Sequence, residues 1–513
     1  MKSTSIDVYK LKLILFGIIV GIFSGAVVSS FRWSIGQLLK LFQGFYVSAR
    51  TSLITGVLVL ICLIVVGIIV SLMLKKEPNI SGSGIPQVEA QLDGELEVKW
   101  WSVLWRKFVG GIISIGPGLF LGREGPAIQL GASVGQGVGE LGRLDSPVSK
   151  RILIASGAAG GLAAAFNAPL AGSMFVLEEI YHNFSPMVWI TALASSVSSN
   201  LVALYVFGLT PVLNIPYKFS LPINMYWHLL VLGIILGLLG RLYQVVLLEM
   251  PSIFAKTKIP RSFQGLIPLI LLLPIGMMFP KYIGGGNGLI VSLSNMKVGL
   301  LVLIGILVLR FVFSMISYGS GLPGGIFLPI LNLGAVIGAV YAVFMHQIGF
   351  LPLSFESNLI IFAMAGYFAC ISKAPFTAII LVTEMVGSLG HLMPLVVISL
   401  VAYIVVDIMN GSPIYEALKE KLTVNKKYLN RVSKFNDRVE IPVFEGSPID
   451  GKYIRDINFP QSVLVISIYR GEMQIIPRGD TLVKSGDRIV MMVNGATRAV
   501  LKKKLTDLIN GID

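Results

Sequence analysis

Two apolar segments interrupted by glycine and proline occur twice in this 513-residue sequence, in the same order. GREGPAIQLGASVG at 122–135 and GIFLPILNLGAVIG at 325–338 share the frame G-x-x-x-P followed by L-G-A-x-x-G. APLAGSMFVLEE at 168–179 and APFTAIILVTEM at 374–385 share Ala, Pro, a Val and a Glu. The displacements are 203 positions (325 − 122) and 206 positions (374 − 168). They predict a duplicated half, and in membrane transporters such halves are often inverted, with broken helices that meet at the substrate site.

The composition is that of a polytopic membrane protein. Hydrophobic residues make up 54% and charged residues 13% of the chain, and the mean hydropathy is +0.80, whereas soluble proteins carry about 25% charged residues. Apolar runs long enough to span a membrane, about 20 residues, lie near 12–30, 52–74, 187–208, 226–248, 298–316 and 391–409. Shorter or broken runs, which we expect to form half-helices, lie near 106–121, 151–166, 169–181, 265–280, 325–345, 357–371 and 375–386.

The net charge of +14 would suggest nucleic-acid binding in a soluble protein, but positive-inside topology explains it here. Lys2, Lys10 and Lys12 precede the first span, and Lys75 and Lys76 follow the second, which predicts that both flanks are cytoplasmic. The first apolar run lacks a small-residue cleavage pattern, so we expect no cleaved signal peptide. The two cysteines and four histidines are scattered, which predicts neither a disulfide framework nor a metal site.

Arg123 and Glu124 stand in an otherwise apolar region. An ionisable residue at membrane depth costs roughly 2.5–3.5 kcal/mol on insertion scales, so one that is kept there usually faces a cavity or an ion path. Gly122, Gly125 and Pro126 allow the chain to break and restart as a helix, and a helix start attracts anions. Glu124 is therefore a candidate functional residue that would compete with an anion. The alternative is a neutralised Arg–Glu pair in a loop.

Two glycine-rich turns need interpretation. In NISGSGIP at 79–86, Ser83 offers a hydroxyl beside free N–H groups, an arrangement that suits a small anion; it lacks the GK[ST] of a phosphate loop, and an ordinary linker is the alternative. KYIGGGNGLI at 281–290 has no strand, lysine or acidic partner at nucleotide-binding spacing. We expect it to be the loop before the next helix.

Four motifs together resemble the anion-site signatures of the CLC chloride channel and transporter family, in that family's order. They are GSGIP at 82–86, GREGP at 122–126, GIFLP at 325–329 and the tyrosine of GSPIYEAL at 411–418. The resemblance covers roughly residues 10–425 and implies an all-α polytopic membrane fold with broken helices and two inverted halves, about 10–220 and 221–425.

The resemblance also implies roles for individual residues. Ser83 and Tyr415 would coordinate a central chloride through hydroxyls, the backbone N–H groups of Ile326 and Phe327 would complete the site, and Glu124 would be the gating and proton-coupling glutamate. Glu179 matches the family's inner proton glutamate, a position that is usually not acidic in plain channels.

Glu178, next to Glu179, calls for a different interpretation. It recurs in the second repeat as Glu384. We therefore expect Glu178 to cap or brace a helix.

The character of the chain changes beyond about residue 425. The segment 418–440 is polar and basic, and the following residues alternate short strands and turns before an amphipathic helix at 496–509. This predicts a small α+β domain of the cytoplasm, and it resembles the RCK_C (TrkA-C) regulatory module. The predicted division is 1–425 for the transmembrane domain, 426–439 for a linker and 440–513 for the RCK_C domain. CLC proteins with paired CBS domains differ from this layout.

Domains that resemble RCK_C commonly dimerise, and several bind cyclic di-AMP in an apolar cleft between subunits. Val463 and Pro477 roughly match positions that line that cleft, although the polar residues of the best-known binders are not clearly present. Cyclic di-AMP is therefore a hypothesis for a regulatory ligand.

Taken together, the resemblances imply a homodimeric chloride/proton antiporter of the cell membrane. It would have cytoplasmic termini, and neither an enzymatic activity nor a cofactor is expected. A passive chloride channel on the same fold is the nearest alternative. A cation transporter or its regulator, and a nucleotide sensor on an inert membrane anchor, remain further alternatives. Fluoride selectivity is disfavoured by Ser83.

Overall fold

The structure is a computed structural model of the chain. It describes residues 8–143, 146–181, 185–209, 211–213, 215, 220–293, 298–425, 436–444, 446–470, 473–494 and 504–505. The chain divides into two compact units. The membrane unit comprises Met1–Glu89 and Val98–Glu420, and the C-terminal unit comprises Ala90–Glu97 and Lys421–Asp513.

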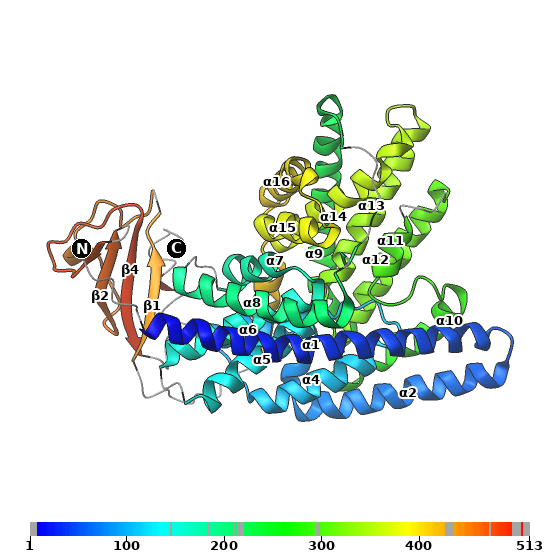
Figure 1. The fold of residues 1–513 in the computed structure, drawn as a ribbon, viewed down its shortest axis with the longest axis horizontal. Coiled ribbons are helices and arrows are strands. Elements are labelled where there is room, and N and C mark those ends of the chain that lie inside the picture. Colours follow the sequence, from blue (N-terminus) through cyan, green and yellow to red (C-terminus); the bar gives the residue numbers. More distant parts are fainter. Residues whose placement is uncertain are drawn as a thin grey trace. The chain divides into compact units, whose positions relative to one another are not determined.

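Helices build the membrane unit (Figure 1). The first half contains α1 (Val8–Ala49), α2 (Leu53–Lys76), α3 (Ile85–Leu92), α4 (Trp100–Ile115), α5 (Glu124–Leu141), α6 (Pro147–Phe166), α7 (Pro169–Phe175), the π-helical turn η2 (Val176–Ile180) and α8 (Pro186–Phe207). The second half contains α9 (Trp227–Ala255), α10 (Leu266–Met278), α11 (Asn287–Leu293), α12 (Leu300–Gly319), α13 (Phe327–Gln347), α14 (Glu356–Ser372), α15 (Pro375–Val386) and α16 (Leu392–Ile408), and α17 (Ile414–Asn425) follows.

Nine helical segments within the described residues are long and apolar enough to cross a membrane. They include Arg261–Met278, Phe327–Gln347 and Leu353–Ser372. Length and composition allow these segments to cross, and the expectation of half-helices near 265–280, 325–345 and 357–371 stays a prediction. α13 and α14 extend slightly beyond the predicted runs, whereas α10 lies within its run. The segment near 375–386 is a short helix of 12 residues, as expected.

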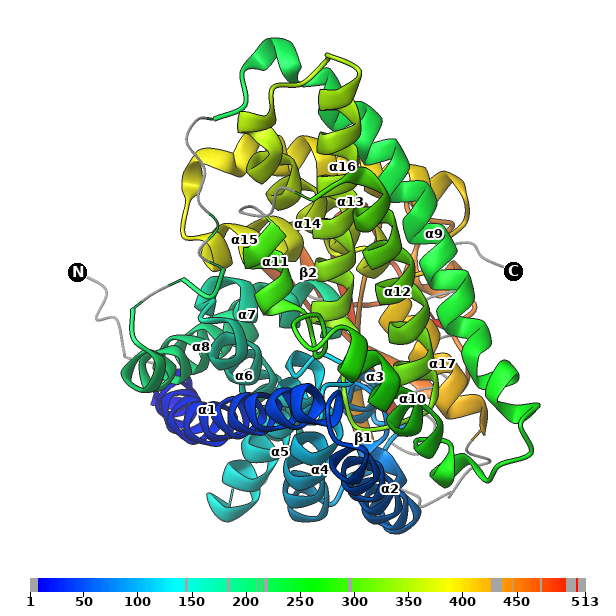
Figure 2. The same cartoon turned by 90° about the vertical axis from the view of Figure 1, so that its right-hand side faces the viewer.

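The second half repeats the packing of the first. In the first half α5 packs on α6, α1 on α8 and α6 on α8; in the second, α13 packs on α14, α9 on α16 and α14 on α16. Figure 1 shows the helices of the first half lying nearly horizontal and α9, α12 and α13 standing steeply, and Figure 2 shows α9 and α12 side by side. This confirms the predicted duplication.

Glycines of the repeated L-G-A-x-x-G frame lie at close helix–helix contacts. A Cβ at Gly131 of α5 would collide with the carbonyl oxygen of Gly157 on α6, and one at Gly157 would collide with that of Gly131. In the second half, a Cβ at Gly334 would lie 2.7 Å from the carbonyl oxygen of Ala363. Small residues let membrane helices approach at backbone distance. The motif therefore encodes packing in both halves.

The C-terminal unit contains a four-stranded antiparallel sheet in the order β1-β4-β2-β3. The strands are β1 (Asn436–Pro442), β2 (Val463–Arg470), β3 (Met473–Ile475) and β4 (Asp487–Asn494). Ile468 pairs with Ile489 of β4 and with Ile475 of β3, so apolar side chains of three strands share one face and its core.

Part of the predicted layout of this unit needs correction or lies outside the described residues. β1 begins at Asn436, so the last residues of the segment assigned to the linker, 426–439, form a strand because they pair with β4. Residues 426–435 and most of the helix predicted at 496–509 lie outside the described residues. The predicted domain boundaries themselves remain predictions.

Candidate functional site

The starts of α5 and α13 meet through a two-stranded bridge between the halves. Gly122 and Gly325 pair in antiparallel fashion, with the N–H of Gly122 2.7 Å from the oxygen of Gly325 and the reverse bond at 2.6 Å. α5 begins at Glu124 and α13 at Phe327, two residues beyond each glycine. Helix starts carry N–H groups without intrahelical partners and a partial positive charge. The bridge therefore creates a place that suits an anion.

The carboxylate of Glu124 occupies this joint. Its side chain has no exposed surface, and the Nε of Arg123 lies 3.7 Å from Oε1. The carboxylate faces the backbone N–H groups of Leu328 and of Glu124 itself, yet neither oxygen makes a well-formed hydrogen bond with any described residue. A Cβ at Gly122 would collide with Oε2, so Gly122 is needed for the carboxylate to fold back over the bridge. The carboxylate of Glu124 therefore lies where an anion could bind, and only the ion pair with Arg123 and weak contacts to backbone N–H groups hold it there.

The Ser83 turn lies against the start of α5. Gly82 and Gly84 have φ values of +61° and +93°, which L side chains rarely adopt. Ser83 is buried, and its Oγ accepts a hydrogen bond from the N–H of Ile85 at 3.2 Å. A Cβ at Gly125 would lie 2.6 Å from this Oγ. The hydroxyl is therefore next to the helix start that carries Glu124.

Tyr415 reaches the same region from α17. Its side chain is fully buried, and its hydroxyl has no hydrogen-bond partner among the described residues. The ring meets Phe175 edge to face at 6.2 Å between centroids, and Phe175 lies 5.7 Å from Phe327. Ile326 and Phe327, at the start of α13, are both buried. The structure thus brings Ser83, Glu124, Ile326, Phe327 and Tyr415 together.

Glu179 stands apart from Glu124, on the π-helical turn η2, and is buried. The charged groups that act on it are Glu89, Glu178, Glu416 and Lys419. Lys419 and Glu89 form an ion pair at 2.6 Å. Glu179 is therefore the buried member of a cluster of carboxylates with one ammonium group.

The hydroxyl of Tyr415 interacts electrostatically with both glutamates, Glu179 and Glu124. The phenol is thus the described side chain that connects the Glu179 cluster to the joint of the two helix starts.

Glu178 and Glu384 cap helices of the opposite half. The carboxylate of Glu178 accepts hydrogen bonds from the N–H groups of Phe376 and Thr377, at 3.1 and 2.7 Å, and from the Thr377 hydroxyl at 2.7 Å. Glu384 accepts from the N–H groups of Leu170 and Ala171 at 3.0 and 2.8 Å. The prediction that Glu178 caps or braces a helix is confirmed, and the cap is reciprocal between α15 and α7.

Sequence reasoning missed Lys107. Its side chain is fully buried in α4, and Nζ donates to the carbonyl oxygens of Ile80 and Gly82 at 2.9 and 2.7 Å. The ammonium group of Lys107 therefore fixes the Ser83 turn by binding two carbonyl oxygens of its backbone. The signal was present, because a lone lysine in an apolar segment near 106–121 costs as much as Glu124 does.

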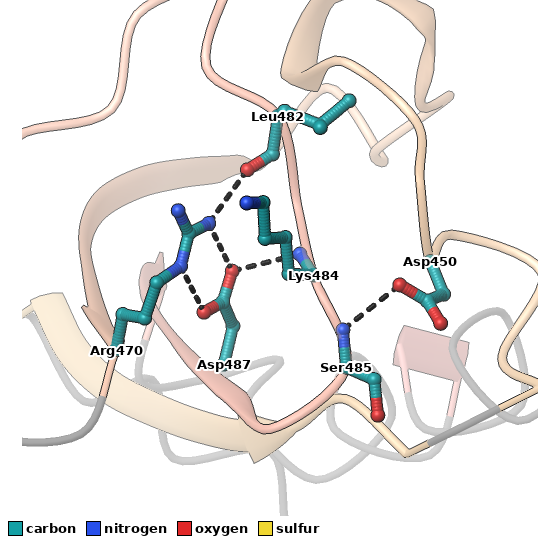
Figure 3. Close-up of polar contacts among 6 residues, drawn as sticks. All are labelled: Asp450, Arg470, Leu482, Lys484, Ser485 and Asp487. Atoms are coloured by element: carbon teal, nitrogen blue, oxygen red, sulfur yellow. Dashed lines mark hydrogen bonds and ion pairs between the residues drawn. The ribbon is translucent and has the colours of Figure 1, made fainter.

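The C-terminal unit contains the remaining predicted residues. Val463 packs against the core of the sheet and pairs with Val493 of β4, and Pro477 follows β3 and is half-buried. Figure 3 shows a polar network of the same unit, in which Arg470 donates to both oxygens of Asp487 at 2.8 Å. Hydrogen bonding to this carboxylate raises the pKa of Arg470 above its ordinary value, so the pair stays charged.

The fold and the site define a multi-pass membrane protein of two inverted repeats whose broken helices meet at a buried carboxylate. Residues 66–407 match the family described as voltage gated chloride channel, and residues 438–506 match the TrkA-C domain. The chain belongs to the voltage-gated chloride channel (CLC) family and carries a C-terminal TrkA-C (RCK_C) domain.

Curated relatives and solved structures fit this assignment. The H(+)/Cl(-) exchange transporter ClcA of Vibrio campbellii is 37% identical over 360 residues, which cover 68% of this chain and 76% of the relative. The protein of the same description from Klebsiella pneumoniae is 33% identical over 448 residues, covering 83% and 92%. The structure of a slow cyanobacterial Cl-/H+ antiporter has a TM-score of 0.76 and 28% identity, over 81% of this chain and 99% of the other. A eukaryotic CLC transporter shares the fold at a TM-score of 0.68 and 21% identity, over 81% and 74%.

Proposed function

We propose that this protein is an antiporter that exchanges chloride for protons across the cell membrane. The observation that carries the proposal is the carboxylate of Glu124, which lies buried between two helix starts without a well-formed hydrogen bond among the described residues. A carboxylate held there by a 3.7 Å ion pair with Arg123 and by the helix starts, without a well-formed hydrogen bond, is expected to leave and return. Relatives described as H(+)/Cl(-) exchange transporters support the choice of ions.

Mutual exclusion couples the two ions. When deprotonated, Glu124 occupies the anion position at the start of α5 and keeps chloride out. When protonated, it loses its attraction to the N–H groups and leaves, and chloride enters beside Ser83, Tyr415 and the N–H groups of Ile326 and Phe327. Each cycle therefore moves a proton one way and chloride the other, with no covalent step.

Glu179 supplies protons from the other side of Tyr415. It is buried among Glu89, Glu178, Glu416 and Lys419, and a carboxylate there can pass a proton onward only through water or polar groups. Tyr415 lies within electrostatic range of both glutamates. The presence of an acid at position 179 favours an antiporter over a passive channel.

Replacing Glu124 tests this proposal. Glu124→Gln removes the proton-carrying group and keeps the shape, so chloride flux through reconstituted vesicles should persist while proton movement falls to background. Glu140→Gln is the control, because Glu140 lies on the same helix but is exposed. Proton coupling that survives in the Glu124 variant would end the assignment.

We further propose that the C-terminal domain regulates transport, that the protein is a homodimer and that both termini are cytoplasmic. Cyclic di-AMP is the candidate ligand at Val463 and Pro477. Calorimetry of the full chain in detergent should show saturable heat with cyclic di-AMP, and substituting Pro477 by Ala should weaken it. No heat at high micromolar ligand would remove this ligand from the proposal.

A further inference from the structure

A second buried cation occupies the repeat-equivalent position of Lys107. Arg310 lies 203 positions further on (310 − 107), the same displacement as between Gly122 and Gly325. Lys107 sits on α4 and Arg310 on α12, and their exposed fractions are 0% and 3%. Both helices precede the helix that starts at the Gly122–Gly325 bridge. The cations are therefore related by the duplication.

Each cation holds a glycine-rich turn in the same way. Lys107 donates to the carbonyl oxygens of Ile80 and Gly82, and Nη1 of Arg310 donates to that of Gly284 at 2.6 Å. The turn at 283–287 is thus the counterpart of the turn at 80–84. This turn is the loop before α11, as expected from the sequence, and it also corresponds to the turn at 80–84.

Side-chain amides and bonds between the halves repeat as well. Gln129 donates to the carbonyl oxygen of Asn79 at 2.9 Å, and Asn332, again 203 positions on (332 − 129), donates to that of Gly286 at 3.0 Å. The N–H of Gly82 donates to Gly321 at 3.3 Å, and the N–H of Gly284 donates to Gly118 at 2.7 Å. Each turn is thus held by an amide of the following helix and by a bond to the other half, although the two amides reach different positions, before Gly82 and after Gly284.

The turns differ in what they leave free. Gly82 and Gly84 match Gly284 and Gly286 in their positive φ values, so Ser83 corresponds to Gly285 and the hydroxyl donor is missing from the second turn. In its place, Nε and Nη2 of Arg310 have no hydrogen-bond partner among the described residues, and no described carboxylate pairs with the guanidinium. Phe120 covers one face of the guanidinium at 4.3 Å, which leaves the edge with its N–H groups available. Burying an unpaired cation is costly, so an anion there would be stabilising.

We propose that Arg310 and the turn 283–287 form a second anion site, which takes a small monovalent anion such as a halide. The halves pair antiparallel at Gly122 and Gly325, so this turn lies on the membrane face opposite to the Ser83 turn. The neighbouring Gly288 is exposed and Asn287 is half-buried, so the site lies close to the surface of the membrane unit. A Cβ at Gly286 would lie 2.6 Å from Nη2, so the free space is small.

The role of this site rests on the proposed function: it holds chloride on the opposite face before or after the anion passes Glu124. The first experiment does not depend on transport. Crystals of the wild-type protein grown in bromide should show an anomalous peak in contact with Nε and Nη2 of Arg310, besides one near Ser83 and Tyr415. Absence of the Arg310 peak overturns the site, and absence of the Ser83–Tyr415 peak counts separately against the proposed function.

The second experiment separates binding from structural support. Vesicles that hold at most one transporter are captured through a C-terminal tag, so that all have one orientation, and chloride is varied on each side. Arg310→Met should raise the half-saturating chloride concentration at least fivefold on one side only, and Lys107→Met on the other side only. Arg310→Lys, which keeps the charge and loses the forked N–H groups, should give a smaller rise on the same side as Arg310→Met.

A purely structural role predicts a different result. The maximal rate would then fall equally from both sides with unchanged half-saturation, and this outcome overturns the proposal. If the variants fail to fold, the bromide result for the wild-type protein decides.

Discussion

Individual buried charges differ in how completely their hydrogen-bonding groups are satisfied. Glu124 has no well-formed hydrogen bond, and Arg310 keeps two free nitrogens, among the described residues of the membrane unit. Asp487 of the C-terminal unit is equally buried but accepts from Nε and Nη2 of Arg470 and from the N–H of Lys484, each at 2.8 Å (Figure 3). A carboxylate whose oxygens are fully hydrogen-bonded stabilises a fold, whereas one without such bonds is free to exchange partners.

Asp487 should therefore matter for stability. Asp487→Ala leaves Arg470 and the N–H of Lys484 without their acceptor, and we expect a loss of about 2–4 kcal/mol in the C-terminal unit. Proteolysis of the full chain at rising temperature would measure it as earlier cleavage beyond residue 436. The control is Asp450→Ala, which removes a single bond to the N–H of Ser485; equal sensitivity of the two variants would contradict the prediction.

At the scale of elements, helix starts of the two halves are joined in pairs. The starts of α5 and α13 are linked by the Gly122–Gly325 bridge, and the starts of α7 and α15 by the carboxylates of Glu384 and Glu178. Carboxylates at helix starts satisfy free N–H groups and the helix dipole. The free N–H groups at these four helix starts are therefore met by partners from the other half.

The reciprocal caps should be stabilising. Glu178→Gln and Glu384→Gln each replace a charged acceptor with an amide whose NH₂ opposes the helix N–H groups, and we expect a loss of about 1–3 kcal/mol in each case. The melting temperature of the purified protein in detergent measures the loss. Glu178→Gln should lower it more, because Glu178 accepts three bonds and Glu384 two. Unchanged melting in both variants would show that the caps are dispensable.

The contact of α5 with α6 should tolerate no added methyl group. Gly131→Ala places a Cβ against the backbone of Gly157, and overpacking of this kind costs about 1–3 kcal/mol. Gly305→Ala on α12 is the matched control, because nothing lies within 4 Å of its Cβ position. Melting temperatures should fall for the first variant and hold or rise for the second; a fall in both would point to helix-wide effects.

At the scale of the whole molecule, the proposed exchange ties chloride movement to the proton gradient. In planar bilayers with equal chloride and a pH difference, an antiporter has a reversal potential away from zero. A passive chloride channel reverses at zero, and that result would replace the proposed function with the channel. Glu124→Gln should shift the reversal potential to the chloride value, because protons no longer take part.

The sequence by itself determined the membrane class, the duplication and the position of Glu124. These features are local: long apolar runs must leave water, repeated glycines and prolines set helix starts, and an acid in an apolar run is costly. It also indicated that Glu178 serves as a cap, because the residue recurs as Glu384.

Only the tertiary structure decided which partners these local features find. The pattern of apolar residues does not say which segments of the chain a helix contacts. The lengths of α13 and α14, and the exchange of caps between α7 and α15, are therefore seen only in the folded structure. The relation between Lys107 and Arg310 likewise depends on two turns that are far apart in sequence. Burying a charged group costs free energy that contacts elsewhere in the fold must offset. The pairing of the two inverted halves determines which charged groups find partners and which remain free to bind an ion.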